Sequence, residues 1–202
     1  MRLIEINKIA EASEKISALV RETECQKSNY FSKLFNTNVF YKREDQQKIK
    51  SFKIRGAYNK ILSLDNNDLN KGLVCASAGN HAQGFALSCS YLNKRGTVFI
   101  PKSAPQLKID RVSQFGGKFI DINIHGLNFY DAYDEAEIFT KKNNMVFIHP
   151  FDDIKVIEGQ ATLFLEMINQ VDFNIDYLFV PIGGGGLLSG AINVFKQLSK
   201  ST

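Results

Sequence analysis

No stretch of the sequence approaches the roughly 18 to 20 uncharged apolar residues that a membrane-spanning helix requires. Residues 1–9 also lack the apolar segment of a secretory signal, so we expect a cytoplasmic protein without membrane contact. Cysteine is scarce, because the chain has only three and no two of them form a Cys-x-x-Cys pair. Their odd number argues against a disulfide framework, and we expect reduced side chains that act as small apolar fillers.

Charge of one sign is not concentrated in any segment. The 25 Lys and Arg residues are balanced by 21 Asp and Glu residues, with a net charge of +4 and no basic run interleaved with aromatics. This pattern gives no support to a nucleic-acid partner. His125 and His149 have no companion at a metal-ligand spacing, so no metal site is expected. With 44% hydrophobic residues, a chain of 202 residues can form one or two modest globular cores.

Short apolar runs alternate with helical patterns from about residue 71 onward. The expected strands are 73–76, 97–100, 119–122 and 146–149, and the expected helices between them are 80–92, 105–115 and 127–142. Such alternation is typical of βαβ units and a parallel sheet. The sequence therefore predicts an α/β fold.

The flanking segments are predicted from caps and periodicity. Asn7 is the expected N-cap of an amphipathic helix over 8–22, and Ser51 is the expected cap of a helix that begins at Lys53. This start places Lys53 in the first turn, at an edge that faces a cleft. The other predicted elements are a short helix after Ser28, strand 39–43, helix 156–169, strand 177–181 and helix 187–198.

A run of four glycines, residues 183–186, follows an apolar strand and precedes a helix. Glycine lets the backbone approach an anion, and the free N–H groups and dipole of a helix start favour negative charge. The run is not a Walker loop, since no Gly-Lys-Ser/Thr ends it. It is not a dinucleotide fingerprint either, since no acidic residue follows about twenty positions on. These residues alone are compatible with a phosphate site and with a plain tight connection in a doubly wound sheet.

The segment from Ser77 to Gly84 reads Ser-Ala-Gly-Asn-His-Ala-Gln-Gly and combines several groups that bind oxygen anions. The side-chain amide of Asn80 can bond a phenolate-type oxygen, and Ser77 with the helix-start amides near Asn80 and His81 can receive a carboxylate. The alternatives are a plain N-cap for Asn80 and an exposed first-turn histidine for His81. Lys53 taken alone is most simply a solvated surface residue, as most lysines are. A lysine that forms a covalent bond with a cofactor must instead be partly stripped of water, and a single lysine in a sequence does not show this.

Several further motifs accompany these two segments: Lys42-Arg43-Glu44-Asp45, Ser51-Phe52-Lys53-Ile54-Arg55-Gly56-Ala57, Pro101 with Lys108, and His149-Pro150-Phe151-Asp152. Together with the segment from Ser77 to Gly84 and the glycine run, they resemble the pyridoxal-phosphate enzymes related to threonine dehydratase, serine dehydratase, serine racemase and tryptophan synthase β. The resemblance extends through nearly the whole chain. It is closest to the threonine ammonia-lyases of the serine/threonine dehydratase family.

This resemblance implies a tryptophan synthase β-like fold with two three-layer α/β/α domains. Residues 1–70 and 151–202 would form the large domain, and residues 71–150 the small substrate-binding domain, with pyridoxal 5′-phosphate between them. Family members continue well beyond the glycine run, so we expect a C-terminally truncated chain with an incomplete large domain. Full-length relatives are expected to be homo-oligomers.

The resemblance also implies a role for each site residue. Lys53 would be the catalytic lysine that bonds the cofactor, and Ser77, Asn80 and His81 would bind the carboxylate of a small amino-acid substrate. Arg55 receives no chemical role. The implied cofactor-binding residues are Phe52, Lys53, Asn80, Gly183, Gly184, Gly185, Gly186 and Leu187.

The implied reaction is an α,β-elimination that converts L-threonine to 2-oxobutanoate and ammonia, the first step of isoleucine biosynthesis, with L-serine to pyruvate as a further activity. Lys53 would remove the α-proton while the cofactor ring takes up negative charge and the β-hydroxyl leaves. Racemising relatives have serine at the position of Ala78, whose methyl group cannot donate a proton, so elimination is favoured. The alternatives are a non-catalytic truncated remnant and a serine dehydratase or racemase.

Overall fold

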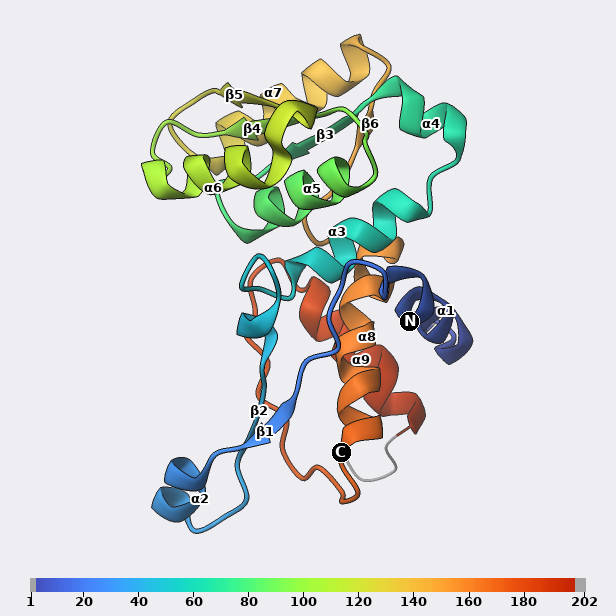
Figure 1. Cartoon of the computed structure of the whole chain (residues 1–202), viewed down its shortest axis with the longest axis vertical. Coiled ribbons are helices and arrows are strands. Elements are labelled where there is room, and N and C mark those ends of the chain that lie inside the picture. Colours follow the sequence, from blue (N-terminus) through green and yellow to red (C-terminus); the bar gives the residue numbers. More distant parts are fainter. Residues whose placement is uncertain (1–2, 199–202) are drawn as a thin grey trace.

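A computed structural model of the chain describes residues 3–198, which form two parts (Figure 1). One part is a four-stranded parallel sheet with helices on both faces, and the other is a group of helices that lies below it in this view. No helix within residues 3–198 is both long and apolar enough to cross a membrane. The helices of the lower group are α1 (Ile6–Ile16), α3 (Lys53–Leu62), α8 (Ile154–Gln170) and α9 (Gly186–Leu198).

The sheet has the strand order β5-β4-β3-β6, and each neighbouring pair is parallel. Its strands are β3 (Leu73–Ala76), β4 (Gly96–Ile100), β5 (Ile120–Ile124) and β6 (Val146–Phe147). Its helices are α5 (Asn80–Tyr91), α6 (Gln106–Gly116) and α7 (Phe129–Lys142). The βαβ pattern predicted from the sequence is confirmed, with element ends shifted by a few residues.

The side chains of β3 alternate between two cores, one on each face of the sheet. Leu73 and Cys75 join the core formed with α5 and α6, whereas Val74 and Ala76 join the core formed with α7. All four side chains are completely buried because helices cover both faces. This part of the molecule is therefore a three-layer α/β/α sandwich.

Helices α3 and α8 cross where both carry glycine. A Cβ atom added to Gly159 would lie 2.5 Å from the carbonyl oxygen of Arg55 and 2.7 Å from the Cα of Gly56. No side chain fits in this space, so the two backbones are in direct contact. The contact fixes the start of α3, which carries Lys53, against the middle of α8.

A narrow arm projects from the helical part (Figure 1). It consists of the antiparallel strands β1 (Cys25–Lys27) and β2 (Phe40–Lys42) with α2 (Asn29–Phe35) at its tip. As predicted, α2 follows Ser28, whose hydroxyl accepts a hydrogen bond from the N–H of Phe31. The remaining short elements are η1 (Glu44–Gln46), α4 (Asn66–Lys71) and η2 (Gly117–Phe119).

Two details of the first predicted helix are wrong. The helix begins at Ile6 behind Glu5, and the Asn7 side chain accepts a hydrogen bond from the adjacent Lys8 N–H at 2.8 Å instead of capping the helix. It also ends at Ile16 instead of continuing to residue 22. Residues 17–20 form a turn in which the N–H groups of residues 19 and 20 bond the Ile16 carbonyl, and both side chains are still buried. The turn buries the same apolar side chains that a longer helix would have buried, which is why their spacing predicted a helix.

The helix that carries Lys53 begins where it was predicted, with a different residue at the cap. Phe52 is the N-cap residue, and the Ser51 hydroxyl accepts from the Lys53 N–H at 3.3 Å. The predicted strand 177–181 is wrong for the described residues, because no strand within 3–198 pairs with this segment. A strand requires a ladder partner, and apolar composition alone does not supply one.

Candidate active site

Lys53 is the first residue of α3 and is half-buried. Its Nζ donates a hydrogen bond to the carbonyl oxygen of Pro150 at 2.7 Å and lies 5.6 Å from the centre of the Phe52 ring. Burial lowers the pKa of the Lys53 amine from 10.5 to about 8, because a charged ammonium loses hydration there. An appreciable fraction of this amine is therefore neutral near pH 7, and only a neutral amine is nucleophilic or basic.

Helix α5 brings the segment 77–84 against the start of α3. A Cβ atom on Gly84 would lie 3.2 Å from the backbone N and Cα of Ile54, so α5 reaches the residue next to Lys53 only because position 84 is glycine. The other glycine of the segment, Gly79, caps α5, and a Cβ atom added to it would meet no atom within 4 Å. The N-terminus of α5 is thus open, beside Lys53.

The polar residues at the start of α5 differ in exposure. Asn80 is exposed and is the first residue of the helix, while Gly79 is its N-cap, so the plain N-cap interpretation of Asn80 is wrong. Ser77 is buried, and its Oγ accepts from the Gly79 N–H at 3.1 Å. The Asn80 side chain and the first N–H groups of α5 are positioned to meet a polar ligand.

His81 is buried, which corrects the expectation of an exposed first-turn histidine. Its Nε2 lies 3.1 Å from the carbonyl oxygen of Ile148, and since a carbonyl only accepts, Nε2 carries the proton. Burial, with a contribution from the nearby positive charge of Lys53, lowers the pKa of His81 to about 3. The imidazole is therefore neutral, and its buried Nδ1 has no hydrogen-bond partner within residues 3–198.

The segment 148–152, which follows β6, joins the elements of the site. The carbonyl oxygen of Ile148 binds His81 and that of Pro150 binds Lys53. The segment is itself held by His149, whose Nδ1 accepts from the N–H groups of residues 151 and 152 at 3.2 and 2.7 Å. No role was predicted for these residues from the sequence, although they belong to the motif His149-Pro150-Phe151-Asp152.

The glycine run packs on the other side of the same segment. A Cβ atom on Gly184 would overlap the Phe151 ring, and one on Gly186 would lie 2.8 Å from the Phe151 carbonyl oxygen. Gly185 has a φ of 85°, which favours glycine. A Cβ on Gly183 or Gly185 would meet no atom within 4 Å, so space remains around the N-terminus of α9. Leu187 contributes its side chain to the core of α8 and α9, which leaves its backbone N–H for a ligand.

Arg55, to which the sequence assigned no chemistry, is the centre of a buried ion network. Its guanidinium makes paired hydrogen bonds with Glu44 at 2.7 and 2.8 Å and with Glu166 at 2.6 and 2.9 Å. Lys42 adds a second contact to Glu166 at 2.6 Å. Burial opposes the charged form of Arg55, but the bonds and charges of both carboxylates outweigh it, and its pKa is raised. The network connects β2, η1 and α8 to the turn of α3 that carries Lys53.

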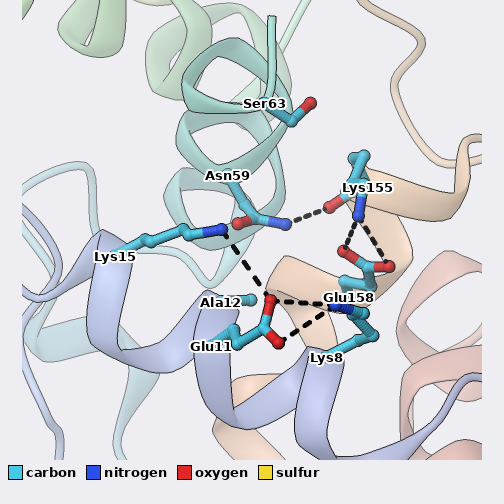
Figure 2. Close-up of a pocket in the computed structure, with 8 residues that line it drawn as sticks. All are labelled: Lys8, Glu11, Ala12, Lys15, Asn59, Ser63, Lys155 and Glu158. Atoms are coloured by element: carbon cyan, nitrogen blue, oxygen red, sulfur yellow. Dashed lines mark hydrogen bonds and ion pairs between the residues drawn. The ribbon is translucent and has the colours of Figure 1, made fainter.

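A small pocket away from Lys53 has neither a reactive lysine of lowered pKa nor an open helix N-terminus. Figure 2 shows it between α1, α3 and α8, with a volume of about 30 Å³. Its charged residues pair with one another, Lys8 with Glu11 at 3.0 Å and Lys155 with Glu158 at 2.8 Å. A cavity of this size holds at most a few water molecules. The pocket is therefore not a candidate active site.

Comparison with known proteins defines the class to which this fold and site belong. Residues 16–202 match the family model described as "Pyridoxal-phosphate dependent enzyme". The chain therefore belongs to this family. The match confirms the resemblance and the fold class predicted from the sequence.

Two curated relatives are similar to this chain over nearly its whole length. The biosynthetic L-threonine dehydratase IlvA of Halalkalibacterium halodurans is 45% identical over 202 residues, which are 100% of this chain and 49% of the relative. The Bacillus subtilis enzyme of the same name is 42% identical over 200 residues, 99% of this chain and 47% of the relative. The chain thus spans about half the length of the curated relatives it matches.

Solved structures give the same result. The processed form of threonine deaminase isoform 2 from Solanum lycopersicum has a TM-score of 0.88 and 36% identity, and the match covers 100% of this chain and 58% of that one. Maize serine racemase has a TM-score of 0.92 and 34% identity, with 99% of this chain and 60% of that one covered. Proteins named threonine deaminase and serine racemase therefore share this fold.

Proposed function

We propose that this chain carries the catalytic lysine and the substrate-binding segment of a threonine ammonia-lyase, which converts L-threonine to 2-oxobutanoate and ammonia. One observation carries the proposal: the Lys53 amine, with a pKa of about 8, lies where α5 and the segment that packs on the glycine run meet. The relatives named biosynthetic L-threonine dehydratase support threonine as substrate and a place in isoleucine synthesis.

The residues fit pyridoxal 5′-phosphate. Lys53 offers a half-buried amine of lowered pKa, and the start of α9 offers N–H groups with open space around Gly183 and Gly185. The phosphate would be bound by the backbone amides of residues 183–187. The Phe52 ring and the Asn80 amide would contact the rest of the cofactor. When bound, the cofactor would supply an electron-withdrawing ring that makes the α-proton of an attached amino acid acidic.

The remaining residues would orient the substrate and move its protons. The hydroxyl of Ser77 and the N–H groups of Asn80 and His81 would hold the carboxylate, with neutral His81 fixed by the Ile148 carbonyl. The Nζ of Lys53 would accept the α-proton, and the Pro150 carbonyl would orient the resulting ammonium. The β-hydroxyl leaves as water with one proton, and hydrolysis of the released enamine consumes one water, giving 2-oxobutanoate and ammonia.

Ala78 favours elimination over racemisation. Its side chain is a methyl group without a proton to donate, and it packs against the core beneath α5. A racemase needs an acid on the ring face opposite the lysine, and Ala78 cannot be that acid. A chiral assay for D-serine distinguishes the two activities, and we expect no D-serine to form.

The proposal also covers the domain organisation, the cellular location and the assembly of the protein. Residues 71–150 would act as a small domain, and residues 1–70 with 151–202 as part of a large one, supported by the core of α8 and α9, whose members all come from these two outer segments. Closure of the two on substrate would exclude water. We further place the protein in the cytoplasm, with a small amino acid as its ligand, as a homo-oligomer when it is combined with the rest of the family sequence.

Activity of the purified chain tests the function. The chain is incubated with pyridoxal phosphate and L-threonine, and 2-oxobutanoate is measured. We expect product that is abolished in Lys53→Ala and retained in Lys48→Ala, which removes an exposed lysine from the preceding segment. Product formation that survives Lys53→Ala would contradict the proposal. A folded chain that forms no product and does not bond the cofactor would favour the non-catalytic alternative.

A further inference from the structure

One histidine shapes the loop between β6 and α8. The Nδ1 atom of His149 accepts hydrogen bonds from the N–H groups of Phe151 and Asp152, at 3.2 and 2.7 Å. A ring nitrogen that accepts a hydrogen bond carries no proton, so the neutral imidazole has its proton on Nε2. The two hydrogen bonds therefore depend on the protonation state and the tautomer of His149.

The same turn occurs twice elsewhere in this chain with an oxygen as the acceptor. The Oδ1 atom of Asn128 accepts from the N–H groups two and three positions further on, at 2.8 and 3.2 Å, and caps α7. The Oδ1 atom of Asp153 accepts at the same two positions, at 2.7 and 3.1 Å, and caps α8. No helix follows His149 directly, because α8 begins only at Ile154. The His149 turn therefore fixes the course of a loop, residues 150–152.

This loop contacts both sides of the candidate site. The carbonyl oxygen of Pro150 accepts a hydrogen bond from the Lys53 Nζ at 2.7 Å. The Phe151 ring occupies the place that a Cβ atom on Gly184 would take, and the Phe151 carbonyl oxygen would lie 2.8 Å from a Cβ atom on Gly186. Pro150 and Phe151 are the residues enclosed by the His149 turn. A change in the turn would therefore move the partner of Lys53 and the support of the glycine run together.

Aromatic side chains hold the imidazole ring in place. The centre of the His149 ring lies 4.7 Å from that of Phe151, 5.9 Å from that of Tyr133 on α7 and 6.2 Å from that of Phe147 on β6. The interplanar angles are 86°, 75° and 69°, which are close to the favourable edge-to-face arrangement. The ring is thus packed between the sheet and the loop, with Nδ1 directed at the loop.

We propose that His149 is a positioning residue, whose unprotonated Nδ1 fixes the Pro150 carbonyl and the Phe151 ring and, through them, Lys53 and the glycine run. Its part in catalysis rests on the proposed function, whereas its effect on the Lys53 amine is measurable without cofactor or substrate. Asparagine, which accepts at the same two positions in the turn that caps α7, should replace His149. Leucine, which has no acceptor, should not.

Protonation distinguishes histidine from asparagine in this role. A proton on Nδ1 would turn the acceptor into a donor that faces two N–H donors. Burial lowers the pKa of His149 below 6.5, with a smaller contribution from the positive charge of Lys53, while nearby carboxylates oppose the shift. The charged and titratable groups around the ring are Asp152, Asp153 at the start of α8, Glu137 and Tyr133 on α7, His81 on α5 and Lys53 on α3. The turn is therefore complete above pH 6.5 and weakens as the pH falls through the lowered pKa.

The reactivity of Lys53 toward a small aldehyde tests the positioning. The chain is methylated with formaldehyde and cyanoborohydride across pH, and peptide mapping gives the rate at Lys53 relative to that at the exposed Lys48. The midpoint of the Lys53 profile should stay at about 8 in the unaltered chain and in His149→Asn. In His149→Leu the loop opens and Lys53 gains hydration, so the midpoint should rise by about 1 pH unit or more and the rate at pH 7 should fall about tenfold. His125→Asn, at an exposed histidine after β5, is the matched control and should change nothing.

Amide exchange at residues 151 and 152 gives a second readout. His149→Leu should reduce protection at both amides by about tenfold or more, because two hydrogen bonds are lost. In the unaltered chain this protection should fall as the pH drops below 6.5, whereas in His149→Asn it should not depend on pH. If His149→Leu does not fold, the comparison of the unaltered chain with His149→Asn across pH still decides.

Two results would overturn the positioning role. One is a His149→Leu chain that keeps the Lys53 midpoint and the protection of both amides. The other is a His149→Asn chain whose protection at residues 151 and 152 is lost, or falls with pH as it does in the unaltered chain. Neither readout involves pyridoxal phosphate or threonine, so a chain that forms no 2-oxobutanoate would refute the proposed function and leave these results unaffected.

Discussion

The lysine side and the glycine side of the candidate site differ in how completely this chain supports them. Lys53 is held by the Pro150 carbonyl, by the glycine contacts of α3 with α5 and α8, and by the Arg55 network in the same turn. The glycine run packs on Phe151, but the segment that leads into it is exposed at Tyr177, Phe179 and Ile182 and pairs with no strand in residues 3–198. The chain therefore preorganises its reactive amine by itself, whereas its anion-binding loop is supported on one side only.

The largest expected effect is on the lysine side. Arg55→Met should destabilise the folded chain by about 3 to 5 kcal/mol, because it leaves Glu44 and Glu166 buried without their shared partner. Urea unfolding measures the loss. Arg43→Met is the matched control, since Arg43 pairs with Asp45 at the surface, where solvent screens the pair, and it should destabilise the chain far less than Arg55→Met does. Equal losses in the two variants would show that the buried network does not anchor this region.

A second pair of variants compares glycines on the two sides. Gly159→Ala should cost about 2 kcal/mol, because its Cβ would lie 2.5 Å from the Arg55 carbonyl oxygen and the helices would have to separate. Gly183→Ala should change stability by less than about 0.5 kcal/mol, because no atom lies within 4 Å of its Cβ position. Thermal unfolding checks both. A costly Gly183→Ala would mean that the glycine loop is already tightly supported.

The sequence predicted the sheet better than the site, for a physical reason. The elements from β3 to β6 depend on local apolar runs and helical spacing, which a sequence displays directly. The buried state of Arg55 and His81 and the contact of Lys53 with Pro150 depend on hydrogen bonds between residues that are 67 to 111 positions apart in the sequence. The sequence motifs identified the segments that form the candidate site, but they could not show which residues of these segments are in contact. The strand predicted at 177–181 fails because its composition requires neighbours that residues 3–198 do not provide.

The free energy of unfolding, measured as a function of pH, tests whether His81 is buried in its neutral form. Its pKa is about 3 in the folded chain and near 6.5 when unfolded, so the unfolded state binds the extra proton between these values. The contribution of His81 to stability is present above pH 6.5 and is lost as the pH falls toward 3, by up to about 1.4 kcal/mol per pH unit. His81→Gln should reduce this slope relative to the unaltered chain. An unchanged slope would mean that His81 is not buried in its neutral form.

The most direct measurement is reductive trapping of pyridoxal phosphate on the chain with borohydride, followed by peptide mapping across pH. The account predicts that Lys53 is labelled first, and that its rate falls about tenfold per pH unit below 8 and levels off above it, since only the neutral amine reacts. Lys48, an exposed lysine, should be labelled more slowly at pH 7. Label spread evenly over the surface lysines, with Lys53 not favoured, would contradict the assignment of Lys53 as the reactive residue.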